Sequence, residues 1–170
     1  MRTRQRDRDT PPPAAPWSEI WPGLWMGGHY WFDGAGEMRS VVVDDEFDLV
    51  VSLFSRPGHG PAPRIDHHLA ELPDAPLTSG QLGRVCELAA LTAEAVRGGR
   101  TVLVRCHSGY NRSGLVVAQT LILLGLDRAA AVGLIRRRRS PWALGTEVFV
   151  QYLEVGLDIA GLLTGLEEPV

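Results

Sequence analysis

The sequence predicts a single α/β domain with a central, mainly parallel sheet flanked by helices. Short apolar runs, typical of buried strands, alternate along the chain with longer segments whose apolar residues recur at helical spacing. The chain has 170 residues, of which 45% are hydrophobic, and this is enough for one sizeable core. The sequence shows neither an internal repeat nor a second domain boundary, so we expect one domain over residues 17–166.

Residues 1–16 are predicted to form a disordered arm ahead of this domain. Arginines alternate with polar residues here, and three consecutive prolines, Pro11 to Pro13, follow them. A segment of this composition buries too little apolar surface to fold by itself.

Strands are expected at about residues 24–26, 48–53, 64–69 and 101–105. Residues 55–64 are rich in proline, glycine and arginine and are expected to form a loop. Ligands of open α/β sheets bind at the carboxyl ends of the strands. We therefore expect a site just after residue 105.

The first long helix is expected to begin at Thr78, because Thr78 and Gln81 have the spacing of a capping box. Apolar residues then recur at helical spacing until Gly98, which ends the run. Cys86 lies on this apolar face, so we interpret it as a core residue. A disulfide with Cys106 under oxidation is the alternative.

Three further helices are expected. Residues 115–124 are apolar on nearly every face, which predicts a central buried helix. Asp127 is expected to cap the next helix, whose last turn carries the four arginines 136–139. The helix dipole favours cations there, so we expect a solvated helix end, with attraction of anionic substrates as the alternative. Thr146 is expected to cap a last helix that reaches residue 160.

Residues 102–114 carry most of the chemical information in the chain. Cys106 follows the expected strand, and Arg112 comes six positions later, where a helix is expected to begin. Backbone N–H groups at a helix N-terminus have no intrahelical partner and bind anions. A guanidinium adds a planar fork that holds two phosphate oxygens at once. The predicted phosphate-binding residues are His107, Ser108, Gly109, Tyr110, Asn111 and Arg112.

The same positive surroundings favour the thiolate form of a cysteine, so Cys106 is expected to be largely ionised at neutral pH. A thiolate attacks phosphorus and forms a covalent phosphocysteine. Ser113 is expected to donate a hydrogen bond to the sulfur and to help it leave in the second step. The alternative is an ordinary buried cysteine near a surface arginine.

This run resembles the signature of the cysteine-dependent protein tyrosine phosphatases, and among them the dual-specificity phosphatases. The signature is a cysteine, five residues, an arginine, and then a serine or threonine, read here from Cys106 to Ser113. The resemblance extends to most of residues 17–155, with residues 20–27 similar to the family's opening strand. It implies a phosphotyrosine protein phosphatase-like fold and hydrolysis of phosphomonoesters through a phosphocysteine intermediate, without a cofactor.

The resemblance also implies a general acid, an aspartate on a loop upstream of the cysteine, which protonates the leaving oxygen and later activates water. Asp74 lies 32 residues before Cys106, in a loop stiffened by two prolines, and is the first candidate. Asp66, inside the expected strand 64–69, is the second. A purely structural turn or strand residue is the alternative for both.

One position departs from the family pattern. The residue before the nucleophile is usually a histidine, thought to order the loop and tune the thiolate, and here it is Arg105. An arginine keeps a positive charge there but cannot make the same hydrogen bonds. A strand-end cation paired with a carboxylate is the alternative interpretation.

Composition excludes several other classes. The net charge of −3 does not suggest binding to nucleic acid or to an anionic membrane. We find no apolar run long enough for a membrane span and no signal peptide. Two cysteines do not form a disulfide framework, which favours a reducing, cytoplasmic location. No metal site is expected, since the adjacent His67 and His68 have poor spacing for one.

The sequence indicates the substrate less clearly than it indicates the reaction. The loop lacks the extra cations typical of inositol phosphate phosphatases, so we favour a protein phosphatase that prefers phosphotyrosine, with dual specificity as a variant. Trp31, Phe32 and Tyr110 are candidates for the walls of the entrance, although ordinary packing explains each equally well. A small phosphorylated metabolite or an RNA 5′ end stays open as a substrate, and the sequence does not indicate an oligomeric state.

Three rival functions are also open. A rhodanese-like sulfurtransferase presents a cysteine on a similar loop but needs no upstream acid. A low-molecular-weight phosphatase or arsenate reductase shares the loop but places it near the N-terminus, the reverse of this chain. A non-catalytic phosphate-binding pseudophosphatase is suggested by Arg105.

Overall fold

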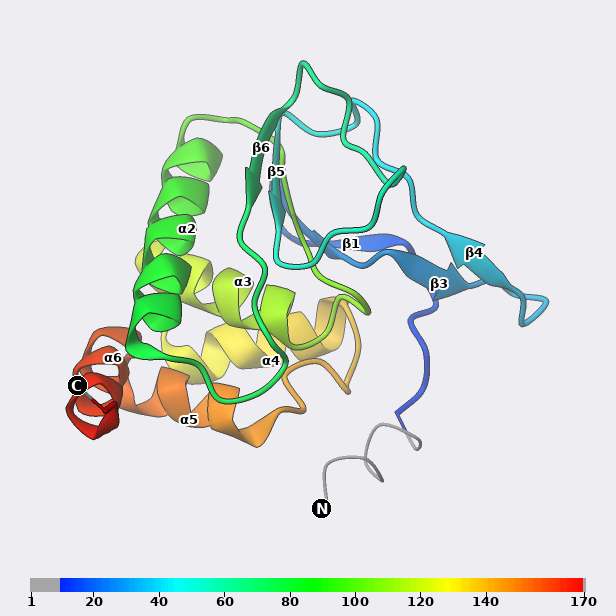
Figure 1. Ribbon diagram of the computed structural model, residues 1–170. Coiled ribbons are helices and arrows are strands. Elements are labelled where there is room, and N and C mark those ends of the chain that lie inside the picture. Colours follow the sequence, from blue (N-terminus) through cyan, green and yellow to red (C-terminus); the bar gives the residue numbers. More distant parts are fainter. Residues whose placement is uncertain (1–9, 170) are drawn as a thin grey trace.

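The computed structural model describes residues 10–169 and contains a sheet of five strands in the order β1-β2-β7-β5-β6 (Figure 1). Its strands are β1 (Trp17–Trp21), β2 (Leu24–Gly27), β5 (Leu49–Ser52), β6 (Asp66–Leu69) and β7 (Val102–Arg105). All neighbouring pairs are parallel except β1 with β2. The predicted α/β class with a mainly parallel sheet is therefore confirmed.

The N-terminal part of the domain contains more strands than the sequence indicated. Gly23, with a φ of 82°, turns the chain between β1 and β2, so the expected opening strand is a hairpin. A second, separate hairpin pairs β3 (Tyr30–Phe32) with β4 (Met38–Ser40) and projects from the body of the domain (Figure 1). These strands of three residues are too short to show a recognisable periodicity.

The helices are α2 (Ser79–Arg97), α3 (Arg112–Leu123), α4 (Arg128–Arg138), α5 (Glu147–Val155) and α6 (Leu157–Glu167). The capping box of Thr78 and Gln81 is present, and Asp127 caps α4 by accepting from the amide of Ala130. Thr146 does not cap α5, contrary to expectation, because its hydroxyl has another partner described below.

The expected last helix is two helices. Gly156, with a φ of 97°, breaks it between α5 and α6, a conformation that favours glycine. In residues 10–169, no single helix has the length and apolar character needed to cross a membrane. Together α5 and α6 reach both, but as a pair bent by 109°.

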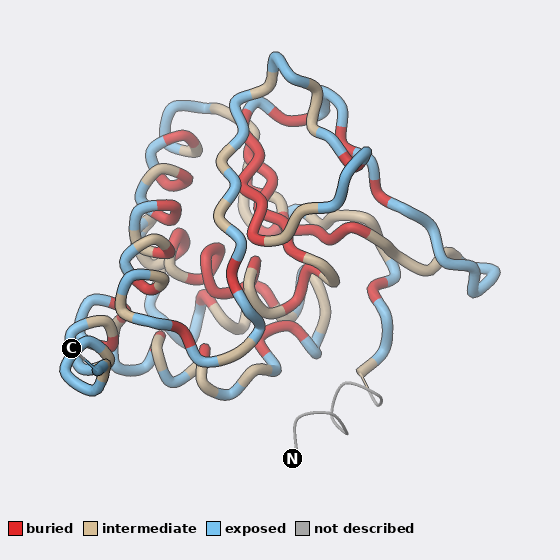
Figure 2. Tube along the Cα trace, in the orientation of Figure 1, coloured by how far each residue is buried: buried red, intermediate tan, exposed pale blue. Residues whose placement is uncertain are grey.

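Strand alternation divides the core into two clusters. Buried residues follow the central strands and the inner faces of the helices (Figure 2). Along β7, Val102 and Val104 face the larger cluster with the helices, and Leu103 faces a smaller cluster containing Val41, Val43 and Phe47. Because side chains alternate along a strand, the next two residues are also directed to opposite faces. Cys106 belongs to the helix-side cluster, which places Arg105 on the other side.

Part of the predicted disordered arm is docked on the domain. Pro13 is buried, and its carbonyl accepts from the amide of Phe32 at 2.8 Å. The carbonyl of Pro16 accepts from the amide of Gly28 at 3.3 Å. These main-chain contacts need no apolar side chains, so composition did not reveal them. Residues 1–9 of the predicted arm lie outside the described residues.

His29, between β2 and β3, is a fully buried polar residue. Its Nδ1 lies 2.7 Å from the carbonyl oxygen of Cys106. Since a carbonyl only accepts, the ring carries its proton on Nδ1. Burial lowers the pKa of His29 to about 4, because an imidazolium here would lose its hydration and lie near the charge of Arg105.

This shift predicts a loss of stability in acid. The folded-state pKa of about 4 is below the ordinary histidine value of 6.5, so the folded protein resists protonation that the unfolded chain accepts. The stabilising contribution is complete above about pH 6.5 and is lost as the pH falls to about 4, by at most roughly 3 kcal/mol.

The measurement is urea unfolding at several pH values between 4 and 7, with His29→Asn as the comparison. The wild type should lose more unfolding free energy toward acid than the variant does. Equal losses in the two proteins would show that His29 is not buried as a neutral ring.

Candidate active site

The loop between β7 and α3 is the centre of the site. Cys106, 2% exposed, directly follows β7, and Arg112 is the first residue of α3. Gly109 turns the loop with a φ of 75°. A Cβ atom at Gly109 would lie 2.5 Å from the main chain of Gly27, so the loop and the end of β2 are in direct backbone contact.

The carbonyl groups of five consecutive loop residues are held by donors from outside the loop. The Cys106 and His107 carbonyls accept from the ring and the amide of His29, at 2.7 and 2.8 Å. Arg139 donates to the carbonyls of Ser108 and Gly109, both at 3.1 Å. The Tyr110 carbonyl accepts from the amide of Leu144 at 3.1 Å.

The amides of residues 107–112, unlike these carbonyls, have no hydrogen-bond partner in the described protein. Within the described chain, none of them donates to a protein acceptor. A peptide directs its N–H away from its C=O, so carbonyls that point outward leave these amides free to converge on an anion. Such a group of amides, at the start of a helix, forms an anion-binding concavity.

Two side chains of α3 complete the predicted site. Ser113 is buried, and its hydroxyl oxygen lies 3.3 Å from the Cys106 sulfur. Arg112 donates to the carbonyl of Leu72 at 3.1 Å, and its guanidinium carbon lies 5.7 Å from the ring centroid of Phe54. In residues 10–169 this guanidinium has no carboxylate partner and its buried Nε has no acceptor, so its charge is available to a bound anion.

Asp74, the first acid candidate, lies beside the loop. Its Oδ2 accepts from Nδ2 of Asn111 at 2.9 Å, and its Oδ1 accepts from the hydroxyl of Thr146 at 2.6 Å. The Oδ1 of Asn111 in turn accepts from the amides of Gly145 and Thr146, at 2.9 and 3.3 Å. Asn111 therefore connects the Asp74 loop and the start of α5 to the phosphate-binding loop.

Asp66, the second acid candidate, lies at the wrong end of the sheet. In the register of the strands it is level with Val102, four residues or roughly 13 Å along the strand before Cys106. Its carboxylate pairs with His68 and Arg100, at 3.1 and 3.2 Å. It is a surface ion-pair residue of β6.

Arg105 is buried without a carboxylate partner among the described residues, so the alternative of a paired strand-end cation is wrong. It donates to the Ser52 hydroxyl at 2.9 Å and to the carbonyls of His59 and Gly60, at 2.9 and 2.6 Å. Burial lowers its pKa to about 10, so it stays charged at neutral pH. Arg105 thus holds the loop 55–64 against the sheet and points away from Cys106.

The four arginines 136–139, at the end of α4, do not act alike. Arg137 and Arg138 are exposed, as the expected solvated helix end requires. Arg136 instead donates to the carbonyls of Ala143 and Leu144, both at 3.1 Å. Arg139 connects the loop to the Ala15 carbonyl at 2.9 Å, and burial lowers its pKa. The sequence offered no signal that distinguishes Arg139 from its neighbours.

The aromatic candidates have different environments. Trp31 packs against the smaller core cluster, and Tyr110 is buried with its hydroxyl donating to the Pro11 carbonyl at 2.9 Å. Both are therefore packing residues. The rings beside the loop are Tyr30 and Phe54, each 4.9 Å from the ring centroid of His107, with Phe32 6.2 Å from Tyr30.

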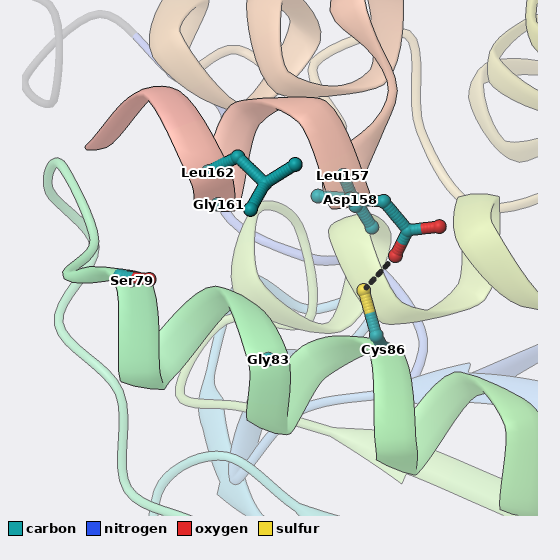
Figure 3. A pocket seen from close by; sticks show the side chains of 7 residues that line it. All are labelled: Ser79, Gly83, Cys86, Leu157, Asp158, Gly161 and Leu162. Atoms are coloured by element: carbon teal, nitrogen blue, oxygen red, sulfur yellow. Dashed lines mark hydrogen bonds between the residues drawn. The ribbon is translucent and has the colours of Figure 1, made fainter. Parts of the chain in front are cut away.

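Cys86 is half-buried at a hollow between α2 and α6, apart from the loop (Figure 3). Its thiol donates to a carboxylate oxygen of Asp158 at 3.6 Å. Burial and this negative charge raise the pKa of Cys86 to about 11, so the thiol is protonated at neutral pH. Cys86 and Cys106 are both free, and Cys86 packs as the predicted core-face residue.

No family model matches the sequence, and no curated protein sequence matches it. Solved structures do. Human DUSP28 is 25% identical with a TM-score of 0.65, over 85% of this chain and 97% of that chain. A mouse putative dual specificity phosphatase complexed with zinc tungstate is 25% identical with a TM-score of 0.58, over 91% of this chain and 94% of that one.

A third similar structure is OH1 from the Orf virus, described as a tyrosine phosphatase with triple substrate specificity. It is 18% identical with a TM-score of 0.59, over 89% of this chain and 92% of that one, which shows likeness of fold. The signature from Cys106 to Ser113 and the two neighbours of 25% identity together show that the chain resembles the dual-specificity-like group of the cysteine-dependent protein tyrosine phosphatase superfamily.

Proposed function

We propose that this chain hydrolyses phosphomonoesters with Cys106 as the nucleophile, as a protein-tyrosine or dual-specificity phosphatase that prefers phosphotyrosine. The observation that carries the proposal is the loop itself. Its carbonyls are all held outward around a buried cysteine, and the free amides and Arg112 provide positive groups for a phosphate dianion.

In the first step, the Cys106 thiolate attacks phosphorus and the S–P bond forms as the P–O bond to the leaving alcohol breaks. Asp74 gives its proton to the leaving oxygen. In the second step a water attacks phosphorus, its proton goes to the Asp74 carboxylate, and the S–P bond breaks. Ser113, 3.3 Å from the sulfur, stabilises the departing thiolate with a hydrogen bond.

Thr146 is a suitable hydrogen-bond partner for Asp74, which must carry a proton for part of the catalytic cycle. A hydroxyl both donates and accepts, so Thr146 can donate to the Asp74 carboxylate and turn to accept from the carboxylic acid. The Asn111 amide group, by contrast, donates in every state, and it keeps Asp74 beside the loop throughout.

The substrate class follows from the surroundings of the loop. The rings of Tyr30, Phe54 and His107 form a continuous aromatic edge beside it, with neighbouring centroids 4.9 Å apart. An aromatic edge favours an aryl phosphate over an alkyl phosphate, which supports phosphotyrosine. The two free cysteines accord with a reducing, cytoplasmic location.

Replacing the nucleophile tests the proposal most directly. Cys106→Ser should lower p-nitrophenyl phosphate hydrolysis on the order of 10³-fold or more, because a serine hydroxyl is not ionised at neutral pH. Mass spectrometry of a quenched wild-type reaction should find the phosphate on Cys106. Cys86→Ser is the matched control and should retain full activity, because its thiol is protonated and lies outside the loop.

Activity that survives in Cys106→Ser would remove the proposed mechanism. Binding of phosphate without any hydrolysis by the wild type would favour the pseudophosphatase. Turnover of thiosulfate without phosphatase activity would favour the sulfurtransferase.

The acid assignment is tested by the leaving group. Asp74→Asn should lower turnover of a phosphotyrosyl peptide by about 10²–10⁴-fold, the usual contribution of a general acid. The loss should be much smaller with p-nitrophenyl phosphate, since p-nitrophenolate leaves without a proton. Asp66→Asn is the control and should behave as wild type. A crippled Asp66→Asn together with a normal Asp74→Asn would reverse the assignment.

A further inference from the structure

The position directly before the nucleophile provides no donor to the phosphate-binding loop. Strand alternation directs Arg105 to the opposite face of the sheet, where its three hydrogen bonds go to Ser52, His59 and Gly60. The Cys106 carbonyl nevertheless has a short hydrogen bond, from Nδ1 of His29 at 2.7 Å. This donor comes from a residue 77 positions earlier in the chain.

We propose that His29 is the positioning residue of the nucleophile, fixing the Cys106 peptide through a neutral Nδ1–H donor. This role rests on the proposed function of the loop as the phosphate site. His29 holds two successive carbonyls, those of Cys106 and His107, one with its ring and one with its amide. Both peptides are thereby fixed in the orientation that leaves the loop amides free.

The main chain around His29 is built for this close contact. A Cβ atom at Gly28 would lie 2.6 Å from the carbonyl oxygen of His107, so a side chain there would push the loop away. A Cβ atom at Gly109 would meet Gly27 at 2.5 Å from the other side. The run Gly27-Gly28-His29 therefore brings its backbone against the loop and then delivers the donor.

The ring of His29 is also fixed in its rotation. Phe54 packs edge-on at 5.0 Å between centroids, and His59 lies at 5.4 Å. The other ring nitrogen, Nε2, is buried and has no partner among the described residues. A buried polar atom without a partner is costly. If the ring rotated, Nδ1 would also lose its partner, so the hydrogen bond at Nδ1 sets the ring orientation.

Neutrality is part of the role. With a pKa lowered to about 4, the ring is uncharged at neutral pH. It donates a hydrogen bond without adding a titrating charge beside the sulfur. Charge at the site is therefore provided by Arg112 and the loop amides, whereas His29 provides orientation.

The test compares two amides of different reach. The Nδ2 of asparagine occupies about the place of Nδ1 in histidine, whereas the amide of glutamine reaches the place of Nε2. His29→Asn should preserve the donor to Cys106, and His29→Gln should lose it. Tungstate, a tetrahedral dianion, is the probe, and calorimetry measures its dissociation constant without any turnover. Circular dichroism melting confirms that each variant is folded.

We expect the tungstate dissociation constant to rise about tenfold or more in His29→Gln and to stay close to wild type in His29→Asn. Alkylation of Cys106 by iodoacetate should follow the same order. Equal tungstate affinity in the two folded variants would overturn the proposal. If the tungstate dissociation constants follow the predicted order but the wild type hydrolyses no phosphate ester, the role of His29 is supported and the proposed function is wrong.

A second measurement needs no variant. Long-range ¹H–¹⁵N spectra of the wild-type protein should show His29 with its proton on Nδ1 at pH 7, and that proton should shift when tungstate binds. A proton on Nε2 instead, or a His29 ring that does not respond to tungstate, would contradict the role assigned here.

Discussion

The site depends on one geometric constraint of the peptide group. Amides of residues 107–112 are directed to a common anion only if the carbonyls of this loop turn away from it, into the surrounding protein. Each buried carbonyl then needs a donor from elsewhere. His29 and Arg139 each provide two and Leu144 provides one, so the loop conformation is specified by residues distributed over the whole domain.

Three arginines near the loop, one buried and two half-buried, have no acidic partner among the described residues. In residues 10–169, Arg105, Arg112 and Arg139 bind only neutral acceptors, either carbonyls or hydroxyls. A carboxylate beside any of them would stabilise the cation but would also offset its positive field. Neutral acceptors orient these side chains and leave their positive charge uncompensated.

Local sequence signals predicted the elements, and long-range contacts determined the rest. The capping box of Thr78 and the cap of Asp127 lie within a few residues of the groups they bind, so spacing alone revealed them. The signature from Cys106 to Ser113 is equally local. His29 and Arg139 act across 77 and 30 residues, and nothing beside them in the sequence marks their partners. Arg139 is also one of four consecutive arginines, which look alike in the sequence but make different contacts in the structure.

Thr146 shows where a sound local inference fails because of a long-range contact. A threonine before an acidic first turn is a good N-cap, and giving up such a cap costs a helix about 1 kcal/mol. Here α5 begins without a side-chain cap, and the hydroxyl binds Asp74 at 2.6 Å instead. The amides of Gly145 and Thr146, just before α5, donate to Oδ1 of Asn111 in the loop after β7. Local preference gives way here beside the proposed site, where such exceptions are expected.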